Sequence, residues 1–221
     1  MTAPSVQFDT AFPALTDHPP LRWQRRLFDQ LRSGQIPRVC DLPTGLGKTS
    51  VIPIWTIALA CQAQEGRPSL PRRLVYVVNR RTVVDQATSV VERVRQRLLD
   101  PDAPQWSTHN GALRALAGAL KGLASTEDQL LAVSTLRGEL ADNEEWKADP
   151  AKPAIIIGTI DMIGSKLLFS GYGDGPYRRA QHAGLVGQDS LLVHDEAHLT
   201  PAFSDLLHHV ADVQHQAHEP R

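Results

Sequence analysis

The chain has 221 residues, 42% of them hydrophobic, and a formal net charge of -1 at pH 7. This length and apolar content are enough to bury a substantial core, and the balanced charge excludes a chain that is polybasic throughout. No apolar run approaches the roughly 20 residues of a membrane helix, and the N-terminus lacks the features of a signal peptide. Cys40 and Cys61 lie in apolar stretches and are expected to be buried thiols. We therefore expect a cytoplasmic protein without a membrane segment, whose contacts with nucleic acid come from a local patch.

Strand-like and helix-like patterns alternate along the chain. Residues 1–19 are polar and proline-bearing, and we expect a loose tail there, followed by one domain over residues 20–221. Strands are expected at residues 38–42, 73–78, 130–134, 154–158 and 190–193, and the β-branched run at residues 73–78 is expected to be buried. Helices are expected at residues 21–31, 48–64, 82–99, 113–123, 161–169 and 201–215. The alternation predicts an α/β fold, a mostly parallel sheet with helices on both faces.

The segment DLPTGLGKT, residues 41–49, lies between an expected strand and an expected helix, which is the position of a phosphate-binding loop. Lys48 is expected to reach the β- and γ-phosphates of ATP, and the Thr49 hydroxyl to hold Mg²⁺. The general loop pattern begins with glycine where this chain has Leu42, and the form found here resembles motif I of superfamily 2 helicases. The backbone around the phosphates is contributed by Pro43, Thr44, Gly45, Leu46 and Gly47.

A second nucleotide motif follows the apolar strand at residues 190–193. Its sequence is Asp195-Glu196-Ala197-His198, and ligands of open α/β sheets bind at the carboxyl ends of strands. We expect Asp195 to hold Mg²⁺, Glu196 to polarise the water that attacks the γ-phosphate, and His198 to couple nucleotide state to a second domain. Two acids that simply favour a helix N-terminus are the alternative for this pair taken alone.

Histidines near the second motif suggest two other readings, both of which we reject. His194 and Asp195 spell the dipeptide of HD nucleases, but no partner histidine cluster precedes them. The later histidines fit no ligand spacing, and a solvated helix is the better interpretation; these are His208, His209, His215 and His218.

Three weaker signals fall in the order expected of a helicase motor. Arg80 and Arg81 follow the strand at residues 73–78, where motif Ia contacts the backbone of a bound nucleic acid. Thr159 follows the strand at residues 154–158 and can hold a phosphate at a helix start. Gln24 resembles the Q-motif glutamine, whose amide can pair with an adenine edge. A solvated surface residue is the alternative for each.

Several longer segments resemble a narrower family, the CRISPR-associated helicase-nuclease of type I systems, in the subtype with a C-terminal HD nuclease. They are LPTGLGKTS, YVVNRRTVVDQ, STLRGEL, EEWKADPAKPAIIIGTIDMIGSKLLFSGYG and HDEAHLTPAF. The resemblance implies a RecA-like ATPase domain that moves along single-stranded DNA in antiviral defence, recruited by an RNA-guided effector complex.

The resemblance also implies parts that this sequence does not contain. A second RecA-like domain and an HD nuclease are expected elsewhere, and the fold is expected to be incomplete after the helix that follows the Asp-Glu-Ala-His motif. Because the second domain supplies charge for hydrolysis, the isolated chain is expected to hydrolyse ATP poorly. Two alternatives stay open: another motor of the same superfamily, such as a restriction translocase or an RNA helicase, or a nucleotide-binding module without turnover.

Overall fold

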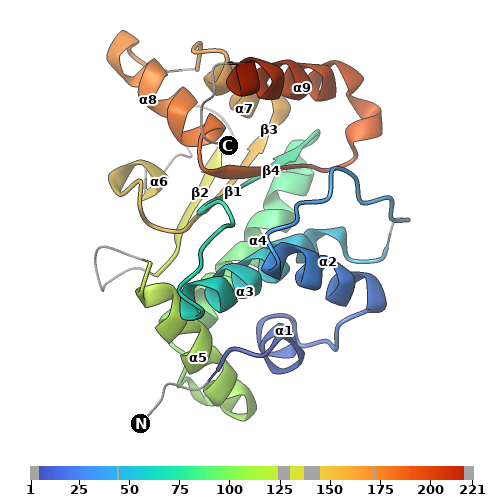
Figure 1. Cartoon of the computed structure of the whole chain (residues 1–221), viewed down its shortest axis with the longest axis vertical. Helices are drawn as coiled ribbons and strands as arrows, with labels where there is room; N and C mark the ends of the chain where they lie inside the picture. Colours follow the sequence, from blue (N-terminus) through green and yellow to red (C-terminus); the bar gives the residue numbers. More distant parts are fainter. Residues whose placement is uncertain (1–4, 44, 124–129, 137–144, 172, 217–221) are drawn as a thin grey trace. The chain divides into compact units, whose positions relative to one another are not determined.

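The structure is a computed structural model, and it describes residues 5–43, 45–123, 130–136, 145–171 and 173–216 (Figure 1). The chain divides into two compact units, and each is described by itself. The helical unit comprises Met1–Leu70, Ser89–Leu131 and Ala151–Pro153. The sheet unit comprises Pro71–Thr88, Ala132–Pro150 and Ala154–Arg221.

The helical unit is built around one apolar helix, α3. Its elements are α1 (Phe8–Thr16), α2 (Arg22–Arg32), the short η1 (Lys48–Ser50), α3 (Val51–Gln64), the later part of α4 (Arg81–Leu99), η2 (Pro104–His109) and α5 (Asn110–Lys121). Helix α3 is apolar on every side, the pattern of a helix that is buried all round. Its residues from Ile52 to Gln62 are all buried, and α1, α2 and α5 contact it.

The expectation of a loose tail at the N-terminus is wrong over α1. Phe8, Phe12 and Leu15 are buried at helical spacing, and the Phe8 ring stacks on Phe28 of α2 with 4.2 Å between ring centroids. Polar neighbours and an internal proline hide this spacing in the sequence, although five apolar side chains of α1 are buried. Arg97 fixes the end of the helix by donating to the Ala14 carbonyl at 2.7 Å.

The sheet unit holds four parallel strands in the order β2-β3-β1-β4. The strands are β1 (Arg73–Val78), β2 (Ala132–Leu136), β3 (Ala154–Thr159) and β4 (Ser190–His194), and the other elements are α6 (Glu145–Ala148), α7 (Ile160–Leu167), α8 (Pro176–Gly187), η3 (Ala197–Leu199) and α9 (Pro201–Gln216). All six residues of β1 are buried, as expected of a parallel strand covered on both faces. The predicted α/β class with a parallel sheet is therefore confirmed.

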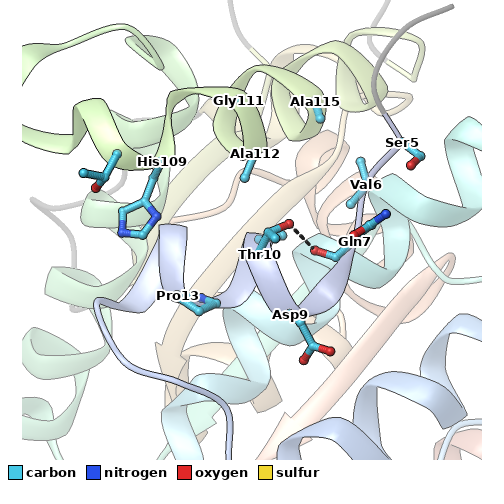
Figure 2. Close-up of a pocket in the computed structure, with 12 residues that line it drawn as sticks. Ser5, Val6, Gln7, Asp9, Thr10, Pro13, His109, Gly111, Ala112 and Ala115 are labelled. Atoms are coloured by element: carbon cyan, nitrogen blue, oxygen red, sulfur yellow. Dashed lines mark hydrogen bonds between the residues drawn. The ribbon is translucent and has the colours of Figure 1, made fainter.

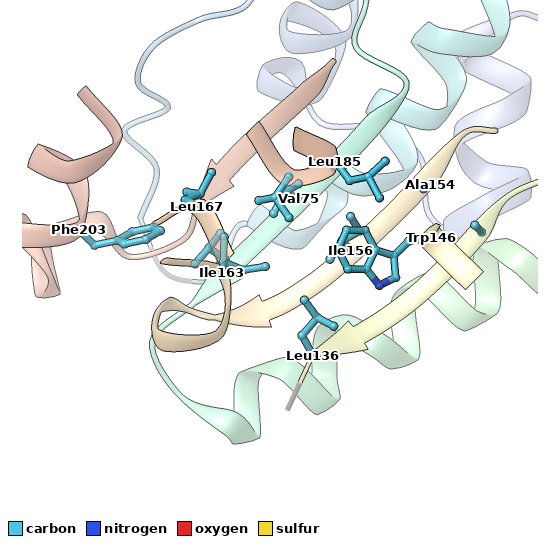
Figure 3. Packing of buried hydrophobic residues seen from close by; sticks show 12 residues of the cluster. Val75, Leu136, Trp146, Ala154, Ile156, Ile163, Leu167, Leu185 and Phe203 are labelled. Carbon is cyan, nitrogen blue, oxygen red and sulfur yellow. The ribbon is translucent and has the colours of Figure 1, made fainter. Parts of the chain in front are cut away.

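One face of the sheet carries the main apolar cluster of this unit (Figure 3). Val75 and Ile156, which are paired in register across β1 and β3, lie on this face. The side chains that cover it come from several helices, among them Trp146 of α6, Ile163 of α7 and Phe203 of α9. On the opposite face the first residues of α4 approach β2, where the Thr88 and Thr135 hydroxyls lie 3.1 Å apart.

The strand predicted at residues 38–42 is not formed. The segment has no regular structure, and Val39 is 79% exposed. A strand exists only with a pairing partner, which five residues of local pattern do not specify, and Pro43 at its end has no N–H to donate. Cys40 lies in this segment and is exposed rather than buried.

The remaining predicted elements are found, with boundaries shifted by a few residues. Helices α6 and α8 were not predicted. The first is only four residues long, and the second begins at Pro176 and mixes small and polar residues, so neither shows a strong apolar period. Among the described residues, no helix is both long and apolar enough to cross a membrane.

Candidate nucleotide and nucleic-acid site

The P-loop residues lie in the helical unit, directly before α3. Gly45 and Gly47 have φ angles of 87° and 68°, in the left-handed region that favours glycine. Lys48 and Thr49 follow at once in η1, so both side chains start from the first turn ahead of α3. The loop is exposed and the two side chains are half-buried. This arrangement fits a triphosphate, because backbone amides and a cation stand together at a helix start. Thr44 lies outside the described residues.

Gln24 is buried and hydrogen-bonded to the turn after this loop, so it is not a solvated residue on the surface of a helix. Its side chain is 5% exposed, and its Nε2 donates to Ser50 Oγ at 2.8 Å. Its Oε1 accepts from the Leu21 N–H at 2.7 Å, and the Ser50 hydroxyl in turn donates to the Gly47 carbonyl at 2.7 Å. The amide therefore ties α2 to the turn that carries Lys48. Recognition of adenine by Gln24 stays a prediction.

The other predicted residues lie in the sheet unit, where three segments meet at one edge. Because the four strands are parallel, their carboxyl ends share that edge, and the register aligns Val78 with Thr159 and Val77 with His194. The arginines follow β1, Thr159 is the last residue of β3, and the two acids follow β4. Ligands of open α/β sheets bind at this edge.

Asp195 is held firmly at the end of β4. Its N–H donates to the Val77 carbonyl at 2.9 Å, which continues the sheet pairing by one residue. Its Oδ2 accepts a hydrogen bond from the Tyr76 hydroxyl at 2.7 Å. The residue is half-buried, so its carboxylate is fixed by the sheet and still reachable. A fixed oxygen ligand of this kind suits Mg²⁺, and Tyr76 is a supporting residue that the sequence analysis missed.

Glu196 adopts an unusual backbone for a non-glycine residue, with φ 51°. A side chain in this region is a strained position that recurs at functional sites. The turn is held by Asn79, whose Nδ2 donates to the Glu196 carbonyl at 3.3 Å. The Thr200 hydroxyl donates to Asn79 Oδ1 at 3.1 Å. The segment after β1 is thereby hydrogen-bonded to the turn that carries Glu196.

His194 belongs to the same network and is occupied by structural contacts. Its Nε2 lies 2.9 Å from Thr200 Oγ1 and its Nδ1 lies 3.3 Å from Ser204 Oγ, while its ring meets Phe203 edge-on. Burial lowers the pKa of His194, and the nearby Asp195 carboxylate opposes that shift. Within the described part of the chain, no group of three or more His, Cys, Asp or Glu side chains could hold a metal.

The residues predicted to contact nucleic acid, and His198, predicted to couple to a second domain, lie at the same edge of the sheet. Arg80 and Arg81 are exposed at the start of α4. Thr159 is the N-terminal cap residue of α7, and its hydroxyl makes no capping hydrogen bond. His198 is exposed in η3, one turn beyond the acids. All four side chains are therefore placed where an incoming ligand can reach them.

The pocket in Figure 2 is a separate feature of the helical unit. It has a volume of about 510 Å³ and lies between the start of α1 and the start of α5, with Asp9, Thr10 and His109 among its polar lining residues. None of the predicted nucleotide-site residues lines it. The pocket is therefore distinct from the predicted nucleotide site.

A parallel sheet with acids at its carboxyl edge, in a chain that also carries a P-loop, defines an ATP-dependent motor domain of the superfamily 2 helicase and translocase class. Comparison with known families supports this directly: the ResIII model, described as type III restriction enzyme, res subunit, matches residues 19–216. The chain belongs to this family. Searches of the curated proteins and of the solved structures found no match.

Proposed function

We propose that the chain binds Mg²⁺-ATP and is the first motor domain of a DNA translocase. The observation that carries the proposal is the Asp195 carboxylate, fixed at the carboxyl end of a parallel sheet by the Tyr76 hydroxyl at 2.7 Å. The same chain also contains a P-loop, in which Gly45 and Gly47 have the left-handed conformations that a phosphate-binding turn requires.

Each proposed residue has a distinct task in that function. Lys48 neutralises the β- and γ-phosphates, and Thr49 and Asp195 hold Mg²⁺, which supplies charge neutralisation on the phosphates. Glu196 accepts the proton of the attacking water. Because charge from a second motor domain accelerates such reactions by several orders of magnitude, we expect slow turnover from this chain alone.

The nucleic-acid part of the proposal uses the same edge of the sheet. Arg80 and Arg81 would contact phosphates of a single strand, and Thr159 would receive a phosphate at the start of α7. The sheet-edge position supports this assignment, because Arg80 directly follows Asn79, whose side chain is hydrogen-bonded to the Glu196 carbonyl. The motor would work in the cytoplasm, where DNA and ATP meet.

For the biological role we propose DNA degradation in type I CRISPR defence, together with an RNA-guided complex, a second RecA-like domain and an HD nuclease. The support is the resemblance of the segment from Trp146 to Gly173 and of the residues from Leu199 to Phe203. The family description favours a second candidate, the translocating subunit of a restriction system. The genomic neighbourhood separates the two, since effector-complex genes support the first and a modification methyltransferase gene supports the second.

The nucleotide assignment is tested by Lys48→Ala with a fluorescent ATP analogue. We expect binding to be lost, because the cation that faces the phosphates is removed. Lys121→Ala is the matched control, since it removes an exposed lysine from the same unit at the end of α5. Equal affinity in Lys48→Ala and in the control would overturn the assignment. Binding without any turnover, even with single-stranded DNA and a supplied second domain, would favour a nucleotide-binding module.

A further inference from the structure

Two aromatic side chains, one just after α7 and one in the first turn of α8, are exposed and contribute little to the core. Phe169, just after α7, is 58% exposed, and Tyr177, near the start of α8, is 97% exposed. Leu168 beside Phe169 is 56% exposed. Large rings usually provide stability by burial, so these positions call for a different explanation.

Phe169 occupies a backbone position where glycine is the normal residue. Its φ is 58°, its N–H donates to the Lys166 carbonyl at 3.1 Å, and the Ser170 N–H donates to the Ser165 carbonyl at 2.8 Å. These two bonds form the Schellman ending of a helix, in which the residue at the left-handed position is usually glycine. A bulky residue there is strained, and such strain is concentrated at functional sites.

The base of the loop is fixed by a buried charged cluster. Lys166 Nζ lies 3.2 Å from Asp174 Oδ2, and both side chains are less than 10% exposed, at 3% and 7%. His182 Nδ1 lies 2.7 Å from the same oxygen, although in an orientation that makes no hydrogen bond. The Trp146 ring contacts this cluster, with Lys166 5.9 Å and the His182 ring 5.3 Å from its centroid. Buried contacts therefore connect α7, which precedes Phe169, with α8, which carries Tyr177.

The charge of the segment favours an anionic polymer. Residues 168–180 contain two arginines, Arg178 and Arg179, and one acid, Asp174. The acid is buried against Lys166 and His182, so its charge is offset inside the unit. Arg178 and Arg179 are exposed and follow the exposed Tyr177 directly in the chain, and positive charge near an aromatic ring is the combination that binds single-stranded nucleic acid through phosphate contacts and base stacking.

We propose that Phe169 and Tyr177, with the adjacent arginines, form a stacking platform for the bases of a single-stranded nucleic acid. The inference rests on the proposed function, and it extends the path of the strand. Helix α7 begins after Thr159 and has eight residues, so at 1.5 Å per residue its far end lies about 12 Å away. A strand held at Thr159 would therefore reach Phe169 by following this helix.

The test is fluorescence anisotropy with a labelled oligothymidylate and the whole chain. Tyr177→Ala and Phe169→Gly should each weaken binding by about 5- to 150-fold, the effect of losing one stacked base. Tyr177→Phe keeps a ring and should bind like the unchanged protein, as should Val213→Ala, which trims an exposed apolar residue of α9 in the same unit. An abasic oligonucleotide should bind all of these proteins equally, because it offers phosphates without bases.

Phe169→Gly adds a readout that a structural role would not give. Glycine relieves the left-handed strain, so its melting temperature should stay level or rise while binding falls. Unchanged oligothymidylate binding by Tyr177→Ala and Phe169→Gly would overturn the platform and leave the motor function standing. Loss of binding on the abasic strand as well would also overturn it, because stacking would not be the cause. No binding by the unchanged protein would overturn both proposals.

Discussion

Tyr76→Phe is the sharpest test of how the sheet positions the magnesium ligand. Tyr76 is 1% exposed, and its hydroxyl donates to Asp195 Oδ2 at 2.7 Å. Phenylalanine keeps the buried ring and removes only that donor. A hydrogen bond to a charged group contributes about 1.5–3 kcal/mol, and residues that orient a metal ligand affect metal affinity by about 10- to 100-fold. The two figures agree, since tenfold corresponds to about 1.4 kcal/mol.

The assay compares binding of a fluorescent ATP analogue with and without Mg²⁺. In Tyr76→Phe we expect the gain in affinity given by Mg²⁺ to shrink by about 10- to 100-fold, while affinity without Mg²⁺ stays the same. Tyr177→Phe is the matched control, because it makes the same chemical change at a residue that is 97% exposed. The reasoning is refuted if Tyr76→Phe keeps the full effect of Mg²⁺, or if it loses equal affinity in both conditions.

Two further predictions concern backbone strain and pH. Gly47→Ala should weaken nucleotide binding by a factor of about 5 to 30, because alanine at φ 68° costs about 1–2 kcal/mol. Steric contact adds little, since the new Cβ would lie 3.7 Å from Gln24 Nε2, an ordinary distance. Titration with the fluorescent ATP analogue checks this, with Gly118→Ala, a helical position with open space, as the control. Burial lowers the pKa of His194 below 6.5, so near that pH the unfolded chain binds a proton that the folded chain does not. The contribution of His194 to folding stability is therefore complete above pH 6.5 and declines as the pH falls below it. Melting temperatures between about pH 7.5 and pH 5.5 should therefore drop less in His194→Gln than in the unchanged protein, and identical pH profiles would contradict the assignment.

Chemistry that depends on local sequence was predictable, because the residues involved are neighbours in the chain. The acids follow β4 directly, and an apolar run that ends in two acids indicates this without a structure. The glycines that take left-handed angles in the P-loop are equally local, since their conformations are required by the turn itself. The fold class followed from the alternation of strand-like and helix-like patterns.

What the sequence did not show depends on which segments meet in space. The segment at residues 38–42 has strand-forming residues, yet pairing decides whether a strand exists, and in the described structure Val39 stays exposed. The N-terminal helix α1 is stabilised by Phe28 and Arg97, which lie far along the chain from it. Neither outcome can be predicted from a short stretch of neighbouring residues.

The hydrogen bonds that hold Asp195 and the Glu196 turn also come from residues far away in the chain, and these residues lie beside the proposed nucleic-acid contacts. Tyr76 and Asn79 lie more than a hundred residues before the groups they contact, with separations of 119 for Tyr76 to Asp195 and 117 for Asn79 to Glu196. They come from β1 and from the segment after it, which also carries the exposed Arg80. The residues proposed to contact a nucleic-acid strand are therefore chain neighbours of those that hold the acids. A displacement of that segment changes the hydrogen bond to the Glu196 carbonyl within one unit, so strand binding and the turn that carries Glu196 share a short physical connection.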